Sequence, residues 1–165
     1  MRPRRSLVIF CGIPGSGKTT IAKPVAAGLG ETFHIETDIL RSMIPRPDYT
    51  PRESKLVYKS CILVAREAMK SGYSAILDGT FLKEDYRDEA LRKLAGFYDT
   101  SLIVYVACDI LTAYMRNASR EARVPKESFI RLYSHFEEPV NALRIDSQKS
   151  NPEVAARAVL LQLRD

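Results

Sequence analysis

The sequence predicts an α/β fold, with a parallel sheet of about five strands, helices on both faces and a small helical lid rich in arginine. Three observations support this prediction. Short apolar runs alternate with longer segments of helical period, the first run ends in a glycine-rich loop, and arginines gather behind the fourth run. Such alternation with short connections is typical of parallel sheets. The length of 165 residues suits one domain, residues 1–165, with the lid at about 112–127.

The predicted strands are short apolar runs rich in branched side chains. The run at 6–11 is apolar without interruption after its first residue, as in a strand that is covered on both faces. The runs at 73–77 and 101–107 are also strong, whereas those at 32–36 and 143–146 are weaker.

The predicted helices span residues 18–29, 51–70, 83–97, 110–121, 126–138 and 152–163. Gly30 and Gly72 follow the first two of these helices, as is usual at helix ends. Asn151 is a suitable N-cap for the last helix. Pro24 lies inside the first helix and is expected to kink it, because proline lacks a backbone N–H.

Composition and charge restrict the possible function classes. Apolar residues make up 45% and charged residues 27%, which is typical of a globular chain. No apolar run approaches the roughly 18–20 residues of a membrane span, and the basic N-terminus lacks a signal-peptide cleavage site. We therefore expect a cytoplasmic protein with no membrane partner. The net charge of +5 suits an anionic partner. Cys11, Cys61 and Cys108 show no C-x-x-C pairing and are interpreted as small buried residues.

The strongest signal is the run GIPGSGKT at residues 12–19, which matches G-x-x-x-x-G-K-[ST] in full. It lies between a predicted strand and a predicted helix, the context in which backbone N–H groups and a helix N-terminus surround a phosphate. Lys18 is expected to reach the β- and γ-phosphates, and Thr19 to ligate Mg²⁺. No guanine-reading Asn-Lys-x-Asp run is present, so ATP is the expected nucleotide. The residues expected to bind it here are Gly12, Pro14, Gly15, Ser16, Gly17, Lys18, Thr19 and Thr20.

Two carboxylates follow predicted strands. Ligands of parallel α/β sheets bind outside the carboxyl ends of the strands, so Asp38 and Asp78 are both expected at the phosphate loop. Asp38 could accept a proton from an attacking hydroxyl, and Arg41 could hold an acceptor phosphate. Asp78 could bind Mg²⁺ through water or hold Arg41. The alternatives are a helix cap for Asp38, a solvated Arg41 and a turn role for Asp78.

Thr80 and Arg87 are further candidates for acceptor binding. Thr80 follows Asp78 and Gly79 directly, and Arg87 lies in the next helix, where it could face the acceptor cleft or be a surface residue.

The arginines of the expected lid could neutralise charge on a transferring phosphoryl group. Arg116 and Arg120 are four residues apart and share a helical face, and Arg123 is a weaker candidate. Arg120 is also expected to contact the nucleotide. A closing lid would exclude water and suppress ATP hydrolysis. The alternative is a solvated basic face.

Three weaker patterns are also present. A basic stripe on the helix at 51–70 could follow a nucleic-acid backbone or be a solvated face; it consists of Arg52, Lys55, Lys59, Arg66 and Lys70. His34 and His135 stand alone, without metal-ligand partners, and are interpreted as structural. Residues 146–149 could line the adenine pocket.

Taken together, these residues resemble small P-loop kinases of the zeta-toxin-like, AAA_33-type group, and most of all the kinase domain of polynucleotide 5′-hydroxyl kinases. The resemblance covers nearly the whole chain. The phosphate loop, Asp38-Ile-Leu-Arg41, Leu77-Asp-Gly-Thr80 and the arginines at 116 and 120 match its blocks in order. It implies a P-loop NTPase fold, with Asp38 as general base toward the 5′-hydroxyl, Arg41 in support and lid arginines on the donor phosphates. No phosphatase domain follows in this sequence.

The expected function is ATP- and Mg²⁺-dependent transfer of the γ-phosphate to a hydroxyl. The favoured acceptor is the 5′-hydroxyl of RNA or DNA, or a nucleotide-like molecule. One alternative is a kinase of a small metabolite, such as a sugar, sugar acid or nucleotide-sugar. The other is a binding module, without catalysis, whose partner interaction depends on ATP. The sequence leaves the oligomeric state open.

Overall fold

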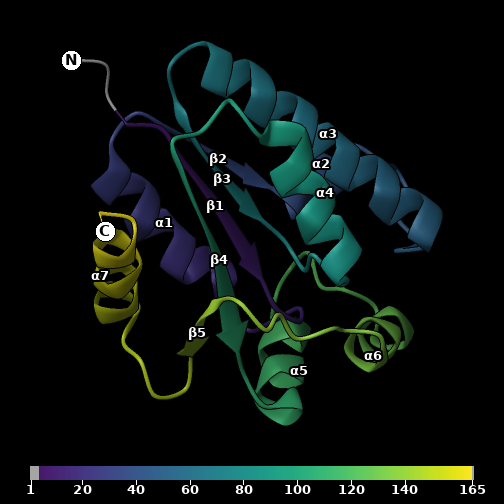
Figure 1. Cartoon of the computed structure of the whole chain (residues 1–165). Coiled ribbons are helices and arrows are strands. Elements are labelled where there is room, and N and C mark those ends of the chain that lie inside the picture. The colour runs from purple at the N-terminus through teal and green to yellow at the C-terminus, as the bar shows by residue number, and fades with distance from the viewer. Residues whose placement is uncertain (1–3, 165) are drawn as a thin grey trace.

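The computed structural model describes residues 4–164 and has a five-stranded parallel sheet at its centre (Figure 1). The strands are β1 (Ser6–Cys11), β2 (Thr32–Glu36), β3 (Ser74–Asp78), β4 (Thr100–Ala107) and β5 (Leu143–Asp146). Their order across the sheet is β2-β3-β1-β4-β5, and every neighbouring pair is parallel. The central strand β1 is buried along its whole length, as its uninterrupted apolar sequence predicts.

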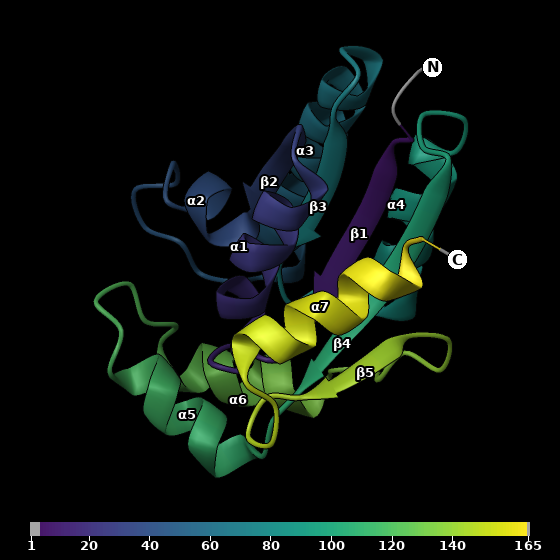
Figure 2. The same ribbon diagram turned by 90° about the vertical axis from the view of Figure 1, so that its left-hand side faces the viewer.

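Helices cover both faces of the sheet (Figure 2). One face packs on α1 (Lys18–Leu29) and α7 (Pro152–Gln162), and the other on α3 (Pro51–Lys70) and α4 (Glu84–Leu94). The short α2 (Thr37–Arg41) follows β2 directly. The helices α5 (Ile110–Ala118) and α6 (Lys126–Ser134) lie together at the carboxyl ends of the strands, where the phosphate loop also lies. We call residues 112–127 the lid segment.

The boundaries of most elements agree with the sequence predictions, and the differences have local causes. The helix α1 continues through Pro24 to Leu29. The helix α5 ends at Ala118 instead of residue 121, because Asn117 turns its side chain back onto both backbone groups of Val124. The helix α4 stops at Leu94, two residues before Gly96, which has a positive φ of 85°. The helix α6 stops at Ser134 instead of residue 138, because the backbone N–H of Glu137 bonds Leu82.

Two of the three cysteines are buried as predicted, whereas Cys108 is not. Cys11 and Cys61 are buried in the core, where burial raises their thiol pKa to about 11 and about 12, and Cys108 is partly exposed. Such buried thiols are protonated and unreactive at neutral pH. Across residues 4–164, no helix combines the length and the apolar character that a membrane crossing requires.

Candidate active site

The phosphate loop is packed so tightly that two of its glycines have no room for a side chain. A Cβ at Gly12 would lie 2.6 Å from the carbonyl oxygen of Val106, and one at Gly15 would collide with the backbone of Ala113 in α5. Both residues also have positive φ angles, 149° and 80°. The loop is therefore fixed between the end of β4 and the lid segment in a conformation that glycine adopts without strain.

Lys18 begins α1 and turns back over the loop. Its Nζ donates hydrogen bonds to the carbonyl oxygens of Gly12 and Ile13, each at 2.9 Å. Burial lowers the pKa of Lys18, while the nearby carboxylates of Asp78 and Asp38 act in the opposite direction. The Lys18 ammonium could exchange these two carbonyl oxygens for phosphate oxygens. Phosphate oxygens are stronger acceptors because they are charged.

Asp78, at the end of β3, is a buried carboxylate with two partners. Its Oδ2 accepts a hydrogen bond from Thr19 Oγ1 at 2.7 Å, and His34 Nε2 lies 2.9 Å from the same oxygen. Only 2% of the residue is exposed. A hydroxyl and a carboxylate in contact at the start of a phosphate-binding helix are the hard oxygen donors that Mg²⁺ prefers, so these residues fit the cation. The sequence suggests that His34 stands alone. In the structure it is part of this contact with Asp78.

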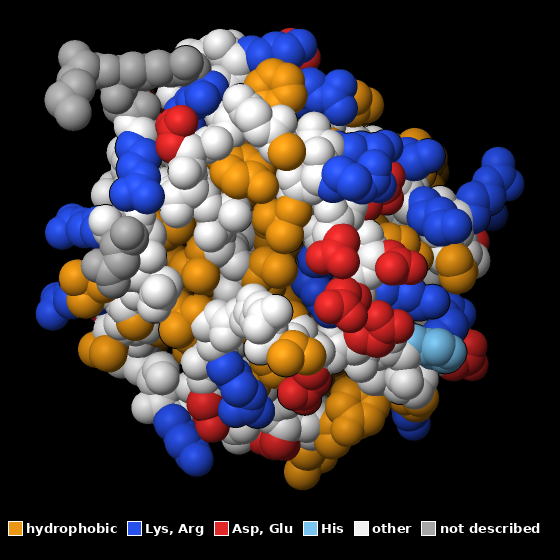
Figure 3. Space-filling view, viewed as in Figure 1, with side chains coloured by type: hydrophobic (Ala, Val, Ile, Leu, Met, Phe, Trp, Pro, Cys, Tyr) orange, Lys and Arg blue, Asp and Glu red, His pale blue; other side chains and the backbone are white. Residues whose placement is uncertain are grey.

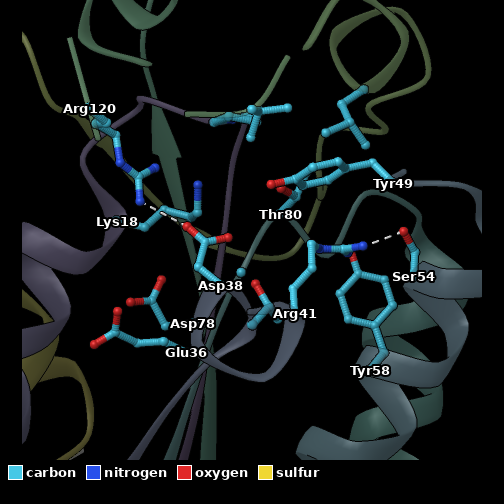
Figure 4. Close-up of a pocket in the computed structure, with 15 residues that line it drawn as sticks. Lys18, Glu36, Asp38, Arg41, Tyr49, Ser54, Tyr58, Asp78, Thr80 and Arg120 are labelled. Atoms are coloured by element: carbon cyan, nitrogen blue, oxygen red, sulfur yellow. Dashed lines mark hydrogen bonds and ion pairs between the residues drawn. The ribbon is translucent and has the colours of Figure 1, made fainter. Parts of the chain in front are cut away.

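Asp38 and Arg120 form an ion pair between α2 and the lid segment. Arg120 Nη2 donates to Asp38 Oδ2 at 2.9 Å (Figure 4). Nearly half of each side chain is exposed, 43% for Arg120 and 46% for Asp38. The pair connects the lid segment to the carboxylate of Asp38, and such an exposed pair contributes only about 0–1 kcal/mol.

Arg41 belongs to a buried network instead of a solvated surface. Its guanidinium pairs with Glu53, donates to Ser54 Oγ at 3.4 Å and lies 4.4 Å from the ring centroid of Tyr49. Glu53 also accepts hydrogen bonds from the backbone N–H groups of Asp48 and Tyr49. The network fixes Tyr49 at a positive φ of 56°, a conformation that is uncommon for a residue with a side chain.

One cavity brings most of the sequence-predicted residues together (Figure 4). Lys18, Asp38 and Arg120 lie around one part of it, and Arg41, Ser54 and Tyr58 around another. The enclosed space is about 30 Å³, enough for a water molecule but not for an acceptor. Predicted residues in its lining are Pro14, Lys18, Asp38, Arg41, Asp78, Thr80 and Arg120; those that sequence reasoning missed are Glu36, Thr37, Tyr49, Ser54, Tyr58, Gly79, Val124 and Leu132.

The other lid arginines lie in different surroundings from Arg120. Arg116 Nη1 donates to Ser147 Oγ at 3.1 Å and would lie 3.9 Å from a Cβ at Gly17, so it borders the phosphate loop outside the cavity. Arg123 is exposed in the turn between α5 and α6. The backbone N–H of Asp109, at the start of α5, donates to Gln148 Oε1, and Ser147 lies beside Gly17 of the phosphate loop.

Arg87 lies neither at the acceptor cavity nor on the surface, the two places that the sequence suggests. It is 1% exposed and lies outside the cavity, where its guanidinium donates to the carbonyl oxygens of Phe81 at 2.7 Å and Glu137 at 2.9 Å. It joins the loop after β3 to the loop after α6. The sequence could not reveal this, because an arginine in a charged amphipathic helix normally faces solvent.

Glu53 and Tyr49, which the sequence prediction does not include, differ in whether a sequence pattern could have revealed them. Thr50-Pro-Arg-Glu53 is a capping-box pattern, and Thr50 Oγ1 does accept the backbone N–H of Glu53 at 3.3 Å. This pattern marks the start of α3, although the Glu53 side chain turns to Arg41 instead of the cap. Nothing in the sequence around Tyr49 points to a cavity.

Solved structures with a similar fold are P-loop kinases and related proteins. The APS kinase CysC of Mycobacterium tuberculosis, in complex with AMPPNP and APS, has a TM-score of 0.80 at 18% identity, with 99% of each chain covered. Kti12 of Chaetomium thermophilum, in complex with ADP-AlF3, has a TM-score of 0.78 at 18% identity, over 96% of this chain and 97% of that one. A sugar kinase of Janibacter sp. HTCC2649 has a TM-score of 0.74 at 23% identity, over 98% and 96%. The chain therefore has a P-loop kinase-like fold.

Sequence comparison gives a curated relative and a family. The UPF0200 protein of Pyrobaculum aerophilum is 26% identical over 121 residues, which cover 70% of this chain and 66%, just under two thirds, of that protein. The family model described as AAA domain matches residues 7–139, from the start of β1 to the loop after α6. This range contains the phosphate loop, Asp38, Asp78 and the lid segment, and the chain belongs to this AAA domain family, AAA_33.

Proposed function

We propose that the protein is an ATP- and Mg²⁺-dependent phosphotransferase that moves the γ-phosphate to a hydroxyl, with the 5′-hydroxyl of RNA or DNA, or a nucleotide-like molecule, as acceptor. The observation that carries this proposal is the common cavity of Lys18 and Asp38. A carboxylate beside the donor phosphates is what a hydroxyl needs when it attacks the γ-phosphorus, because its proton must be accepted.

The proposed reaction assigns one task to each group. The loop N–H groups and Lys18 hold the β- and γ-phosphates. Thr19 and Asp78 would hold Mg²⁺, which neutralises charge on those phosphates when it is bound. Asp38 accepts the proton of the acceptor hydroxyl while that oxygen bonds to the γ-phosphorus, and the bond between this phosphorus and the departing ADP oxygen breaks. The products are ADP and the phosphate ester.

Arg120 has two positions in this proposal. In the structure it pairs with Asp38 beside a cavity of about 30 Å³. With ATP bound, it exchanges this carboxylate for the transferring phosphoryl group, which carries more charge. The exchange would free Asp38 and open the cavity to the acceptor in the same movement. Arg116, beside the loop, would contact the donor phosphates.

A second cavity supports an acceptor with a ring and a negative charge. It has a volume of about 250 Å³ and shares Tyr49, Ser54 and Leu132 with the first, so the two are neighbours. Its lining adds the ring of Tyr86 and the basic side chains of Lys83, Arg131 and His135. Aromatic faces stack on nucleobases, and basic side chains attract phosphates. An acceptor with its hydroxyl at Asp38 could extend past Tyr49 into this space.

The basic stripe on α3 supports the same acceptor class. The helix α3 begins beside the cavity that contains Lys18 and Asp38, and its residue Ser54 is part of the cavity lining. Lys and Arg side chains gather over the outer part of this helix (Figure 3). Arg52, Lys55, Lys59 and Lys70 are exposed, whereas Arg66 is partly buried. A strand that continues beyond the cavity would therefore meet positive charge.

A kinase of a small metabolite is the second candidate. It is favoured by the likeness of the fold to a sugar kinase and to an APS kinase, and by the small enclosed cavity. The two candidates separate in one experiment with γ-labelled ATP, Mg²⁺ and parallel acceptors: single-stranded RNA and DNA with 5′-hydroxyls, nucleosides and sugars. Label at the oligonucleotide 5′ end supports the first candidate. Label only on a small molecule supports the second, and ATP hydrolysis alone contradicts both.

A further inference from the structure

A histidine of the edge strand β2 lies against the buried carboxylate of the proposed magnesium site. His34 Nε2 is 2.9 Å from Asp78 Oδ2, and only 14% of the His34 side chain is exposed. The same Asp78 oxygen accepts the hydroxyl hydrogen of Thr19 at 2.7 Å. In the sheet, Asp78 is paired in register with Glu36, which lies two positions after His34. The His34 ring therefore reaches along the strand toward the phosphate loop.

The chemistry of the contact defines which atom carries the proton. An ionised carboxylate has no hydrogen to give, so His34 Nε2 must be the donor, and in the neutral ring Nδ1 is then the unprotonated nitrogen. The carboxylate in turn holds the hydroxyl hydrogen of Thr19. This leaves the lone pairs of the Thr19 oxygen free for a cation. A chain of hydrogen bonds thus runs from His34 through Asp78 to Thr19.

We infer, on the basis of the proposed magnesium site, that His34 is a positioning residue for that site. It holds the Asp78 carboxylate in the orientation that Thr19 and the cation need. Hydrogen-bonded partners of this kind fix the orientation of metal ligands in many proteins.

Lys18 is a further cationic group that the Asp78 carboxylate could bind. The Asp78 charge acts on Lys18, whose Nζ bonds the carbonyl oxygens of the phosphate loop. A carboxylate released from His34 could turn to the ammonium of Lys18. Such a pair would occupy both the lysine that binds phosphate and the carboxylate that binds the cation. In the inferred role, His34 keeps the Asp78 carboxylate available for the cation.

The test measures ADP affinity with Mg²⁺ and with EDTA in three variants. His34→Leu removes the donor, and His34→Gln keeps a donor near the position of Nε2. Thr32→Val is the matched control: it lies on the same face of β2, and its buried hydroxyl has no hydrogen-bond partner among residues 4–164.

We expect His34→Leu to lose about 10- to 100-fold of the affinity that Mg²⁺ adds in the wild type. Its affinity in EDTA should be weakened far less, and His34→Gln and Thr32→Val should keep most of the magnesium effect. If His34→Leu keeps the full magnesium effect, the role of His34 is structural and the inference is wrong. A wild type without any magnesium effect would instead contradict the proposed magnesium site itself.

The wild-type protein decides the question if His34→Leu does not fold. Nitrogen NMR of the imidazole ring reports which nitrogen is protonated. The inference requires a protonated Nε2, whose signal shifts in Asp78→Asn. A ring protonated at Nδ1 alone would overturn it.

Discussion

The guanidinium of Arg120 donates a hydrogen bond to the carboxylate of Asp38 at 2.9 Å, across 82 residues of sequence. The pair joins the proposed base to the lid segment. In the proposed reaction, Arg120 exchanges this carboxylate for the transferring phosphoryl group. Because both side chains are nearly half exposed, the pair can open at little energetic cost. The proposed exchange of Arg120 from Asp38 to a phosphoryl group therefore requires little energy to break the pair.

Replacement of Arg120 by alanine tests this exchange. Arg120→Ala should lower the rate constant of transfer about 10²- to 10³-fold, because the transferring group then loses the charged donor that lies beside Asp38. ADP affinity should change much less. Arg157→Ala, on the exposed face of α7, is the control with the same charge change. Unchanged transfer in Arg120→Ala would show that the arginine only closes the lid.

Lys18 is expected to make nucleotide affinity dependent on pH. Burial lowers its pKa below the ordinary value of 10.5, and only the charged ammonium attracts phosphate. The affinity for ADP should therefore fall as the pH rises through this lowered pKa. Lys18→Ala should bind ADP weakly at every pH, whereas exposed Lys23→Ala should follow the wild type. Calorimetric titrations across alkaline pH measure this, and an affinity that declines identically in wild type and Lys18→Ala would contradict it.

The buried pair of Arg41 and Glu53 should matter for stability. Glu53→Ala leaves the Arg41 guanidinium, which is 6% exposed, without its carboxylate, and should lower the free energy of unfolding by about 3–5 kcal/mol. Glu67→Ala breaks the exposed pair with Lys70 in the same helix and should cost about 1 kcal/mol or less. Urea unfolding of the two variants measures the difference. Equal effects would mean that the buried network does not hold the loop at Tyr49.

The sequence predicts the sheet and the phosphate loop because each has a strong local cause. The apolar runs at 6–11, 73–77 and 101–107 favour burial side by side in a sheet, and the glycines of the loop follow the first of them. Asp38 and Asp78 could also be placed, since the carboxyl ends of parallel strands meet at one edge. These are properties of neighbouring residues.

The remaining features depend on contacts between distant residues. The sequence suggests Arg87 at the acceptor, but this arginine bonds Glu137, which lies 50 residues away. The ends of α5 and α6 depend on bonds from Asn117 to Val124 and from Glu137 to Leu82. His34 carries no signal in the sequence, because its partner Asp78 belongs to another strand. No local pattern contains such information.

The basic stripe gives a prediction that separates oligonucleotide from metabolite acceptors. The double change Lys55→Glu and Lys59→Glu should weaken binding of single-stranded oligonucleotides. It should also reduce the slope of log affinity against log salt by about 0.7 for each phosphate that these lysines no longer neutralise. Arg157→Glu, on the opposite side of the sheet, should have little effect. Fluorescence anisotropy at several salt concentrations measures the slope. An unchanged slope would show that the basic stripe does not bind oligonucleotide phosphates.

The most direct measurement compares Asp38→Asn with the wild type in phosphate transfer from γ-labelled ATP to an accepted hydroxyl, with ADP affinity measured on the same samples. Exposed Asp85→Asn in α4 is the control. The proposed function predicts that Asp38→Asn loses about 10²- to 10⁴-fold in transfer, because no group then accepts the hydroxyl proton, while it still binds ADP. Transfer at the wild-type rate in Asp38→Asn would contradict the assignment of the base. Absence of transfer in the wild type with every acceptor, together with intact ATP binding, would contradict the proposed kinase and leave a nucleotide-dependent binding module.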